Sequence, residues 1–223
     1  IMKNIAATTG KSKPGRSKAE SAVSGSDRDS QELRESLTAQ TTAALQDLNF
    51  LDVNFAIDFR KKKNYTDNGT DDIQYLISTN PGETLKPLGQ IVSGGELSRI
   101  MLALKAILAD RDEIETLIFD EIDTGISGRT AQKVSEKMAV IGQHHQVLCI
   151  THLPQIAAMA DSILDREAPE GTETITEIHP LEGEDSIQEL ARLLGGAEIT
   201  QAVYQNAKEM KELAQVHKNT RLK

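Results

Sequence analysis

The sequence predicts an α/β protein, with a mostly parallel sheet flanked by helices and with β-hairpins beside it. Two short apolar runs, at 116–120 and 146–151, have the composition of strands that are buried on both faces. A helical pattern follows each run, at 128–143 and 153–161, and another precedes them at 95–109. Strands that alternate with helices in this way are expected to pair in parallel.

The first part of the chain predicts a helix and then a hairpin. Residues 1–29 are rich in Ser, Gly, Lys and Ala without periodicity, which is typical of a flexible or linker segment. Apolar residues recur at helical spacing over 30–48, with Ser30 as a suitable N-cap. Alternating apolar residues at 51–59 and a second apolar run at 73–79 predict an antiparallel pair of strands with a long loop at its tip.

The last part of the chain predicts a second hairpin and two helices. The strands of this hairpin are expected at 162–167 and 172–181, on either side of a Pro-Glu-Gly turn. The first helix is predicted at 185–194 with Gly195 as its C-cap, and the second at 197–216.

Composition limits the classes of function. The net charge of the 223 residues is −9, which argues against phosphate contacts over the whole surface. Basic residues cluster near the start and at 60–63, and we interpret both clusters as solvated surface. No signal peptide or membrane-spanning run is found, and Cys149 is the only cysteine. We therefore expect a cytoplasmic protein without disulfides and without a membrane partner.

The stretch "VSGGELSR" is the first candidate site. Ser93, Gly94, Gly95 and Glu96 stand where a helix begins, and the first N–H groups of a helix have no internal partner. Glycines let an anion approach that backbone closely, and the serine hydroxyl can donate one more hydrogen bond. An ordinary capped helix after a glycine turn explains the same residues equally well.

Two adjacent carboxylates form the second candidate site. Asp120 and Glu121 end an unbroken apolar strand, and ligands of parallel sheets gather at the carboxyl ends of strands. An Asp in this place can hold Mg²⁺, and the neighbouring Glu can orient and deprotonate a water molecule. The alternative is a strand that simply ends in charged loop residues.

A histidine at the end of the next apolar strand is the third candidate. His152 follows Thr151, and a histidine beside a carboxylate pair can contact a phosphate oxygen. A structural role is the usual alternative for such a histidine. His144 and His145 are adjacent but lack the spaced Cys or His partners of a metal site, so we expect no metal there.

These motifs, in this order, carry a family resemblance. "VSGGELSR" resembles the signature motif of ABC-type ATPases, "LIFDE" resembles their Walker B strand and "ITH" resembles their H-loop. The wider stretches "ISTNPGETLKPLGQIVSGGELSRIMLALK", "FDEIDTGISG" and "ITHLPQIAAMAD" closely resemble the RecN family of DNA repair proteins, which are relatives of the SMC proteins. "LEGEDSIQELARLLGGAEIT" is similar to the C-terminal helices of that family.

The resemblance implies the C-terminal lobe of an ABC/SMC-type P-loop ATPase head that acts in DNA double-strand break repair and recombination. Residues 30–50 would be the root of the returning helix of a coiled coil, and 51–223 would be the lobe. Two heads would form a homodimer with ATP between them, and DNA would be bound by the full protein. The location implied is the cytoplasm, in association with the nucleoid.

The same resemblance implies a role for each candidate residue. Ser93 and Gly95 would touch the γ-phosphate of ATP held by the opposite head, with Gly94 and Glu96 in the same nucleotide-binding motif. The roles implied for the remaining residues are a ligand of Mg²⁺ for Asp120, the general base for Glu121 and a γ-phosphate sensor for His152.

The chain departs from the pattern of such ATPases in two places. No Walker A loop is found: "TTGKSK" at 8–13 contains Gly-Lys-Ser, but the motif requires Gly at position 5, which is Ile5. We therefore expect the chain to be a C-terminal part or a truncated product that is inactive alone and needs an N-terminal Walker A half. Most ABC and SMC heads also carry an Asp where this chain has Ser127, although RecN-like sequences resemble the chain there.

Two other classes of function remain open at this point. The chain could be the nucleotide-binding subunit of an ABC transporter, which would need a surface that couples to membrane helices. It could also be a non-catalytic module that supplies signature and Walker B surfaces without turnover.

Overall fold

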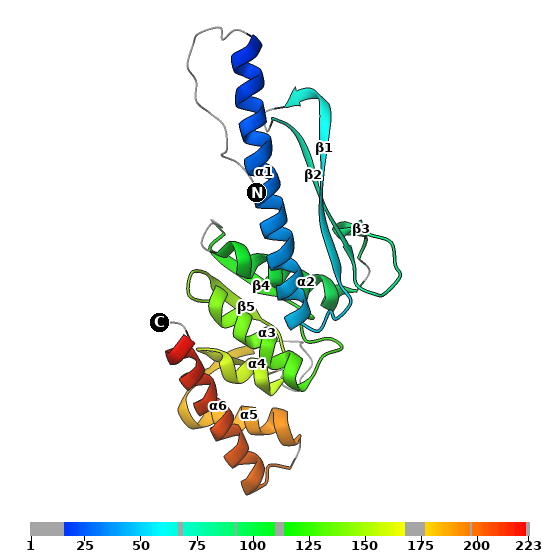
Figure 1. Cartoon of the computed structure of the whole chain (residues 1–223). Coiled ribbons are helices and arrows are strands. Elements are labelled where there is room, and N and C mark those ends of the chain that lie inside the picture. Colours follow the sequence, from blue (N-terminus) through cyan, green and yellow to red (C-terminus); the bar gives the residue numbers. More distant parts are fainter. Residues whose placement is uncertain are drawn as a thin grey trace. The chain divides into compact units, whose positions relative to one another are not determined.

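A computed structural model describes residues 16–66, 69–91, 93–109, 114–167, 177–196 and 198–221 (Figure 1). The chain divides into two compact units, which are described separately below. The first unit lies within Ile1–Gln46 and Phe50–Ile91, and the second within Asp47–Asn49 and Val92–Lys223. In this division, residues 50–91 belong with the preceding helix. The family resemblance implied that residues 51–223 form one lobe.

The first unit begins with a long helix, α1, at Arg16–Asp47. The sequence predicted a flexible or linker segment at 1–29, and the structure has helix from Arg16 onward. Ala, Lys, Arg and Glu in this stretch favour helix, and a helix that is already nucleated over 30–47 elongates at little cost. The "TTGKSK" stretch lies outside the described residues.

The predicted antiparallel hairpin is confirmed, but its long loop is not. Strands β1 (Asn54–Thr66) and β2 (Gly69–Ser78) pair from Asn54↔Ser78 to Thr66↔Gly69, so most of the expected loop is strand. Cross-strand ion pairs favour this extension, with Lys61–Asp71 at 4.0 Å and Lys62–Asp72 at 3.4 Å.

The hairpin side chains divide between its two faces. Val53, Phe55 and Ile57 are buried, as the alternation predicts. In the basic cluster at 60–63, Arg60 Nε also pairs with an Asp58 oxygen at 2.7 Å. Arg60, Lys61 and Lys62 therefore face carboxylates of the hairpin itself, which agrees with their interpretation as solvated surface. The unit ends with β3 (Lys86–Pro87) and the short 3₁₀ helix η1 (Leu88–Gln90).

The second unit contains the predicted βαβ element. Helix α2 (Gly94–Leu108) precedes β4 (Thr116–Phe119), α3 (Gly128–Ile141) and β5 (Gln146–Cys149). Strands β4 and β5 pair in parallel, from Thr116↔Gln146 to Phe119↔Cys149, and α3 forms the crossover between them. This arrangement confirms the parallel pairing expected from the sequence.

The rest of the second unit is a hairpin and three helices. The elements are α4 (Pro154–Met159), β6 (Ile163–Glu167), β7 (Glu177–Leu181), α5 (Gly183–Gly195) and α6 (Gln201–Arg221). Strands β6 and β7 are antiparallel, which confirms the second hairpin, although its Pro-Glu-Gly turn lies outside the described residues. Helix α5 ends one residue later than expected, because Gly196, with φ 73°, is the C-cap.

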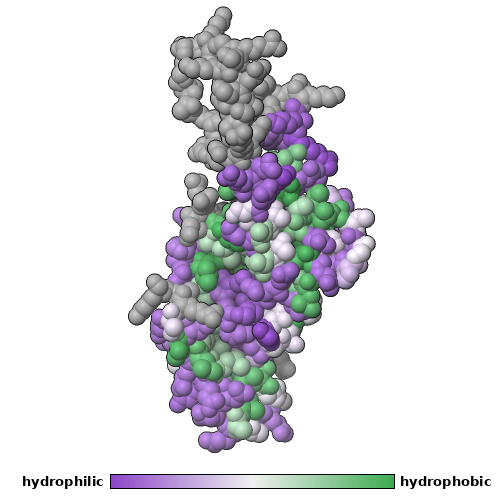
Figure 2. Space-filling model, in the orientation of Figure 1, coloured by the Kyte–Doolittle hydropathy of each residue, from purple (hydrophilic) through white to green (hydrophobic). Residues whose placement is uncertain are grey.

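One face of the β4–β5 pair is open. Ile118, Leu148 and Ile150 lie on the same face and are 70%, 41% and 67% exposed. The expectation that these strands are buried on both faces is therefore wrong for the described residues. The sequence pattern is that of a sheet with helices packed on both faces, but no described residues pack over this face. On the side shown in Figure 2, hydrophobic residues form scattered patches among hydrophilic ones.

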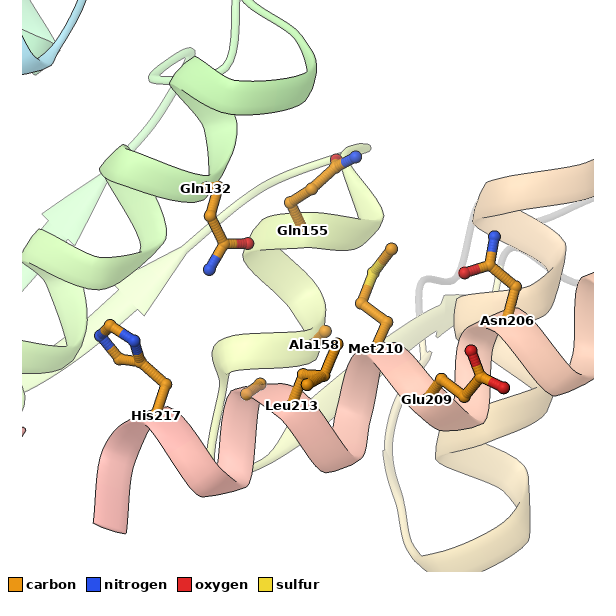
Figure 3. A pocket seen from close by; sticks show the side chains of 9 residues that line it. Gln132, Gln155, Ala158, Asn206, Glu209, Met210, Leu213 and His217 are labelled. Atoms are coloured by element: carbon orange, nitrogen blue, oxygen red, sulfur yellow. The ribbon is translucent and has the colours of Figure 1, made fainter. Parts of the chain in front are cut away.

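The C-terminal helices enclose a small-residue core. Helix α6 packs on α4 and α5, and α3 packs on α4. The cluster consists of Ala157, Ala158, Met159, Ile163, Leu190, Ala191, Ala207 and Ala214. A groove of about 420 Å³ between α3, α4 and α6 contains none of the predicted site residues (Figure 3). None of the helices in the described part of the chain is long and apolar enough to cross a bilayer.

A buried histidine links α2, the helix that begins at the signature-like motif, to the strand β4 that follows it. His145 is 8% exposed, and its Nδ1 lies 2.6 Å from the carbonyl oxygen of Ile114, just before β4. Its Nε2 lies 3.0 Å from the carbonyl oxygen of Ala109, the C-cap of α2. His145 thus has a structural role in linking these two elements.

Replacement of this histidine tests its structural role. His145→Phe keeps most of the volume but removes the ring N–H that can donate to a buried carbonyl oxygen. We expect the free energy of unfolding to fall by about 1–3 kcal/mol in urea denaturation. The exposed neighbour His144→Phe serves as the control and should change it by less than about 0.5 kcal/mol. Equal midpoints for the two variants would contradict this role.

Candidate functional site

The predicted anion-binding serine is the N-cap of α2. Ser93 Oγ accepts a hydrogen bond from the backbone N of Glu96 at 3.3 Å, and its carbonyl oxygen accepts one from Leu97 N at 3.0 Å. Ser93 thus caps the helix, which is the alternative that the sequence left open. The cap uses Ser93 Oγ as an acceptor, so the hydroxyl proton remains available. The first N–H groups of a helix also attract an anion.

The two candidate carboxylates lie in a tight turn that follows β4. Glu121 has φ 56°, a left-handed conformation that is uncommon for a residue with a side chain. Its backbone N donates to Asp120 Oδ1 at 2.9 Å, and its carbonyl oxygen accepts from Thr124 N at 3.1 Å. A strained residue of this kind persists only where its surroundings hold it, and such residues cluster at functional sites.

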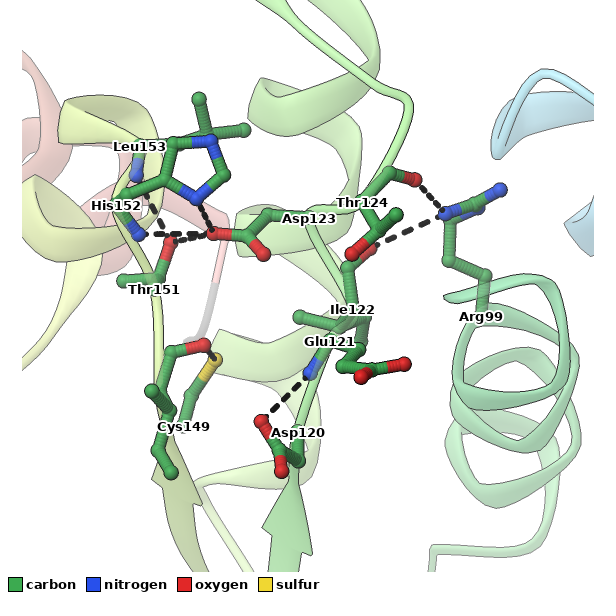
Figure 4. Close-up of polar contacts among 11 residues, drawn as sticks. Arg99, Asp120, Glu121, Ile122, Asp123, Thr124, Cys149, Thr151, His152 and Leu153 are labelled. Carbon is green, nitrogen blue, oxygen red and sulfur yellow. Dashed lines mark hydrogen bonds and ion pairs between the residues drawn. The ribbon is translucent and has the colours of Figure 1, made fainter. Parts of the chain in front are cut away.

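Helix α2 holds this turn from one side (Figure 4). Ser98 Oγ donates to the carbonyl oxygen of Asp120 at 2.9 Å. Arg99 is 8% exposed, and its Nη1 donates to the carbonyl oxygens of Thr124 at 2.9 Å and Ile122 at 3.3 Å. Burial lowers the pKa of Arg99 from its usual value. The signature helix therefore satisfies the backbone oxygens of the turn that carries the carboxylates.

The signature glycines make this close approach possible. A Cβ at Gly94 would collide with the carboxylate of Glu121. A Cβ at Gly95 would lie 2.9 Å from the carbonyl oxygen of Glu121 and 3.0 Å from Thr124 Cβ. Gly95 is thus needed to pack the start of α2 against the backbone of the turn, whereas the Glu121 side chain could turn away from a Cβ at Gly94.

Asp123 holds the same turn from the other side, and the sequence analysis did not single it out. It is 5% exposed, and its Oδ2 accepts from Thr151 Oγ1 at 2.7 Å and from His152 N at 2.9 Å. His152 Nδ1 lies 3.0 Å from the same oxygen (Figure 4). A third acid within "FDEIDTG" was the available signal, but we considered only the adjacent pair as candidates.

The predicted site residues come together through this turn. Glu121 meets the start of α2, and the turn also meets His152 at the end of β5. The sheet brings the two strand ends side by side, because Ile150 N donates to the carbonyl oxygen of Phe119 at 3.1 Å. The side chain of His152 is 72% exposed, so it remains available to a ligand.

The single cysteine lies beside these carboxylates and is not reactive. Burial, Asp123 and Asp120 together raise the pKa of Cys149 to about 12. The thiol therefore remains protonated at neutral pH and is a poor nucleophile. Cys149 lies in β5, the strand beside the site.

The residues fit a Mg²⁺ ion that is held jointly by the protein and by substrate phosphates. Asp120 would be the ligand that the protein supplies. Asp120 is exposed at the end of β4, and one of its oxygens is engaged by the backbone N of Glu121. The described residues contain no cluster of three acidic, His or Cys groups that could hold a metal alone. Mg²⁺ is commonly held by one or two carboxylates together with substrate phosphates.

A methyl group at Gly95 tests the contact between α2 and the turn. Gly95→Ala should reduce the free energy of unfolding by about 1–3 kcal/mol, because backbone of the turn has to move. The control is Gly89→Ala, since a Cβ at Gly89 meets nothing within 4 Å. It should leave stability unchanged or raise it by less than about 1 kcal/mol. If both variants melt at the same temperature, the contact is looser than described.

The relatives found by sequence comparison carry the same name. The chain is 45% identical over 184 residues to the DNA repair protein RecN of Halalkalibacterium halodurans, covering 82% of this chain and 33% of that protein. It is 46% identical over 157 residues to the DNA repair protein RecN of Bacillus subtilis, covering 70% of this chain and 27% of that protein. The chain thus spans about a third of the length of these relatives or less. No protein-family model matches it.

The fold has neighbours among solved structures. An Smc head domain with a coiled coil and joint from Pyrococcus yayanosii has a TM-score of 0.51 and 18% identity, over 78% of this chain and 33% of that one. The Smc head domain from Pyrococcus furiosus, solved with the C-terminal domain of ScpA, has a TM-score of 0.50 and 18% identity, over 71% of this chain and 38% of that one. At this identity the likeness shows the fold alone, which is that of an SMC-type head lobe. The sequence relatives show that the chain belongs to the RecN family, where it matches the C-terminal part of the members.

Proposed function

We propose that this chain is the ATP-hydrolysing head segment of a RecN-type protein that acts in DNA double-strand break repair and recombination. The observation that carries the proposal is the turn at 120–124, which brings the signature helix, both carboxylates and His152 together. The relatives are named DNA repair proteins, which supports the biological role. None of these comparisons supports the transporter hypothesis.

The chemistry follows from where each group lies. Glu121, held in its strained conformation, is the general base that orients and deprotonates the attacking water. His152 contacts the γ-phosphate with its exposed ring. Mg²⁺, bound through Asp120, would neutralise charge on the phosphates. Ser93, Gly94, Gly95 and Glu96 form the helix start that receives the phosphate of ATP held by a second head.

An N-terminal half that carries a Walker A loop completes the site in this proposal. The open face of β4 and β5, with Ile118, Leu148 and Ile150, supports it because exposed apolar sheet faces mark surfaces that pack on another element. Such a partner would supply the missing cover as well as the phosphate-binding loop. The chain alone would then bind ATP weakly and would not turn it over.

The wider assembly also belongs to the proposal. Two heads form a homodimer with ATP between them, and the full protein binds DNA at the nucleoid in the cytoplasm. Residues 30–50 are the root of the returning coiled-coil arm, and 51–223 is the C-terminal lobe of the head. Arg60, Lys61 and Lys62 of the first hairpin pair with its own acids, so DNA contacts are expected elsewhere in the full protein.

Removal of the proposed base tests the catalytic assignment. In a head assembled with the Walker A half, Glu121→Gln should lower ATP turnover by about 10²–10⁴-fold, because the base is lost while its shape is kept. ATP-dependent dimerisation, measured by analytical ultracentrifugation, should persist. Glu115→Gln, at an exposed acid just before β4, is the matched control. Unchanged turnover in Glu121→Gln would remove Glu121 from the role of base.

A charge on the open face tests the missing half. Ile118→Glu should weaken association of this chain with the Walker A half by about tenfold or more, since a charge would be buried at the contact. Its own stability should change little, because Ile118 is 70% exposed. Leu51→Glu, at a residue that is 73% exposed in the other unit, is the control and should bind normally. Equal affinities in a titration would show that this face is not the docking surface.

A further inference from the structure

The hydrogen bonds around Asp123 have a fixed direction. Leu153 N can only donate, and it donates to Thr151 Oγ1 at 3.0 Å. The single proton of Thr151 is therefore free to point at Asp123 Oδ2, 2.7 Å away. His152 N also donates to that oxygen, at 2.9 Å. A carboxylate oxygen with these partners acts only as an acceptor.

This direction determines the state of the histidine ring. His152 Nδ1 lies 3.0 Å from the same Oδ2, so a lone pair on Nδ1 would face an acceptor. A proton on Nδ1 replaces this repulsion by attraction to the carboxylate oxygen. The hydrogen bond at one ring nitrogen decides the state of the other. Nε2 is consequently the ring atom left for a ligand.

We propose that Asp123 is a positioning residue that fixes His152 with a proton on Nδ1 and Nε2 available to the substrate. Its catalytic consequence rests on the proposed ATPase function. A phosphate oxygen needs a donor, and Nε2 is the ring nitrogen left to meet it. The buried carboxylate of Asp123 lies beside the ring and fixes which nitrogen faces the phosphate.

Asp123 also couples two parts of the site. It belongs to the turn that carries Glu121, and its Oδ2 accepts from the backbone N of His152 and lies 3.0 Å from the ring Nδ1 of the same residue. One carboxylate thereby fixes the position of the proposed base, Glu121, relative to the proposed γ-phosphate contact, His152. A displacement of the turn would move the histidine with it, so both groups reach or leave the phosphate together.

The first test measures the ring directly and needs no activity. Two-bond ¹H–¹⁵N spectra of the histidine-labelled chain should show His152 with its proton on Nδ1 where the ring is neutral. Asp123→Asn should shift it toward the Nε2-protonated tautomer. Thr151→Val, which removes a different bond to Asp123, should leave the tautomer as in the wild type. The buried ring of His145 reports in the same spectrum that the fold is intact.

The second test measures the consequence for turnover in the head assembled with the Walker A half. Asp123→Asn should reduce ATP turnover at saturating ATP by about 10- to 100-fold, the range typical when an outer residue that orients a functional histidine is lost. A wild-type ring protonated on Nε2, or one unchanged by Asp123→Asn, would overturn the proposal. A tautomer change with full turnover would overturn its catalytic part. An inactive wild-type assembly would overturn the proposed function instead, and the spectra would still decide the role of Asp123.

Discussion

The turn at 120–124 is held from two sides, and the arrangement of the site depends on it. Arg99 and Ser98 of α2 satisfy its carbonyl oxygens, while the carboxylate of Asp123 binds the start of the loop after β5. Without these contacts nothing would maintain Glu121 at φ 56°, a conformation that costs on the order of 1–3 kcal/mol. The chain therefore builds the position of the proposed base in advance of any ligand.

The open sheet face agrees with the proposal of a second half. Among the described residues, the β4–β5 pair leaves Ile118, Leu148 and Ile150 exposed on one face, and no Walker A pattern is found in the sequence. In the proposal, one N-terminal half would supply both the cover and the loop. The functional unit would then be an assembly, to which this chain would contribute the groups that act on the terminal phosphate.

Much of the fold could be predicted from the sequence, because periodicity reports burial within one chain. The parallel βαβ element, both hairpins and the helix at the signature motif were all expected. The open sheet face was not, because apolar residues on both sides of a strand look the same whether the cover belongs to this chain or to another. The extended hairpin was missed because cross-strand pairs such as Lys62 and Asp72 resemble loop composition when read in order. Asp123 was missed because its partners lie about thirty residues away, and only the fold brings them together.

Native-state hydrogen exchange on this chain is the most direct test of whether the turn at 120–124 is held in place before a ligand binds. The amide of Ile150 belongs to the sheet, the amide of Thr124 closes the turn, and the amide of His152 bonds Asp123. If α2, the turn and β5 form one cooperative element, the three amides exchange with the same opening free energy. Rapid exchange at Thr124 and His152 beside a protected Ile150 would show that the turn opens independently, which would contradict a site built in advance.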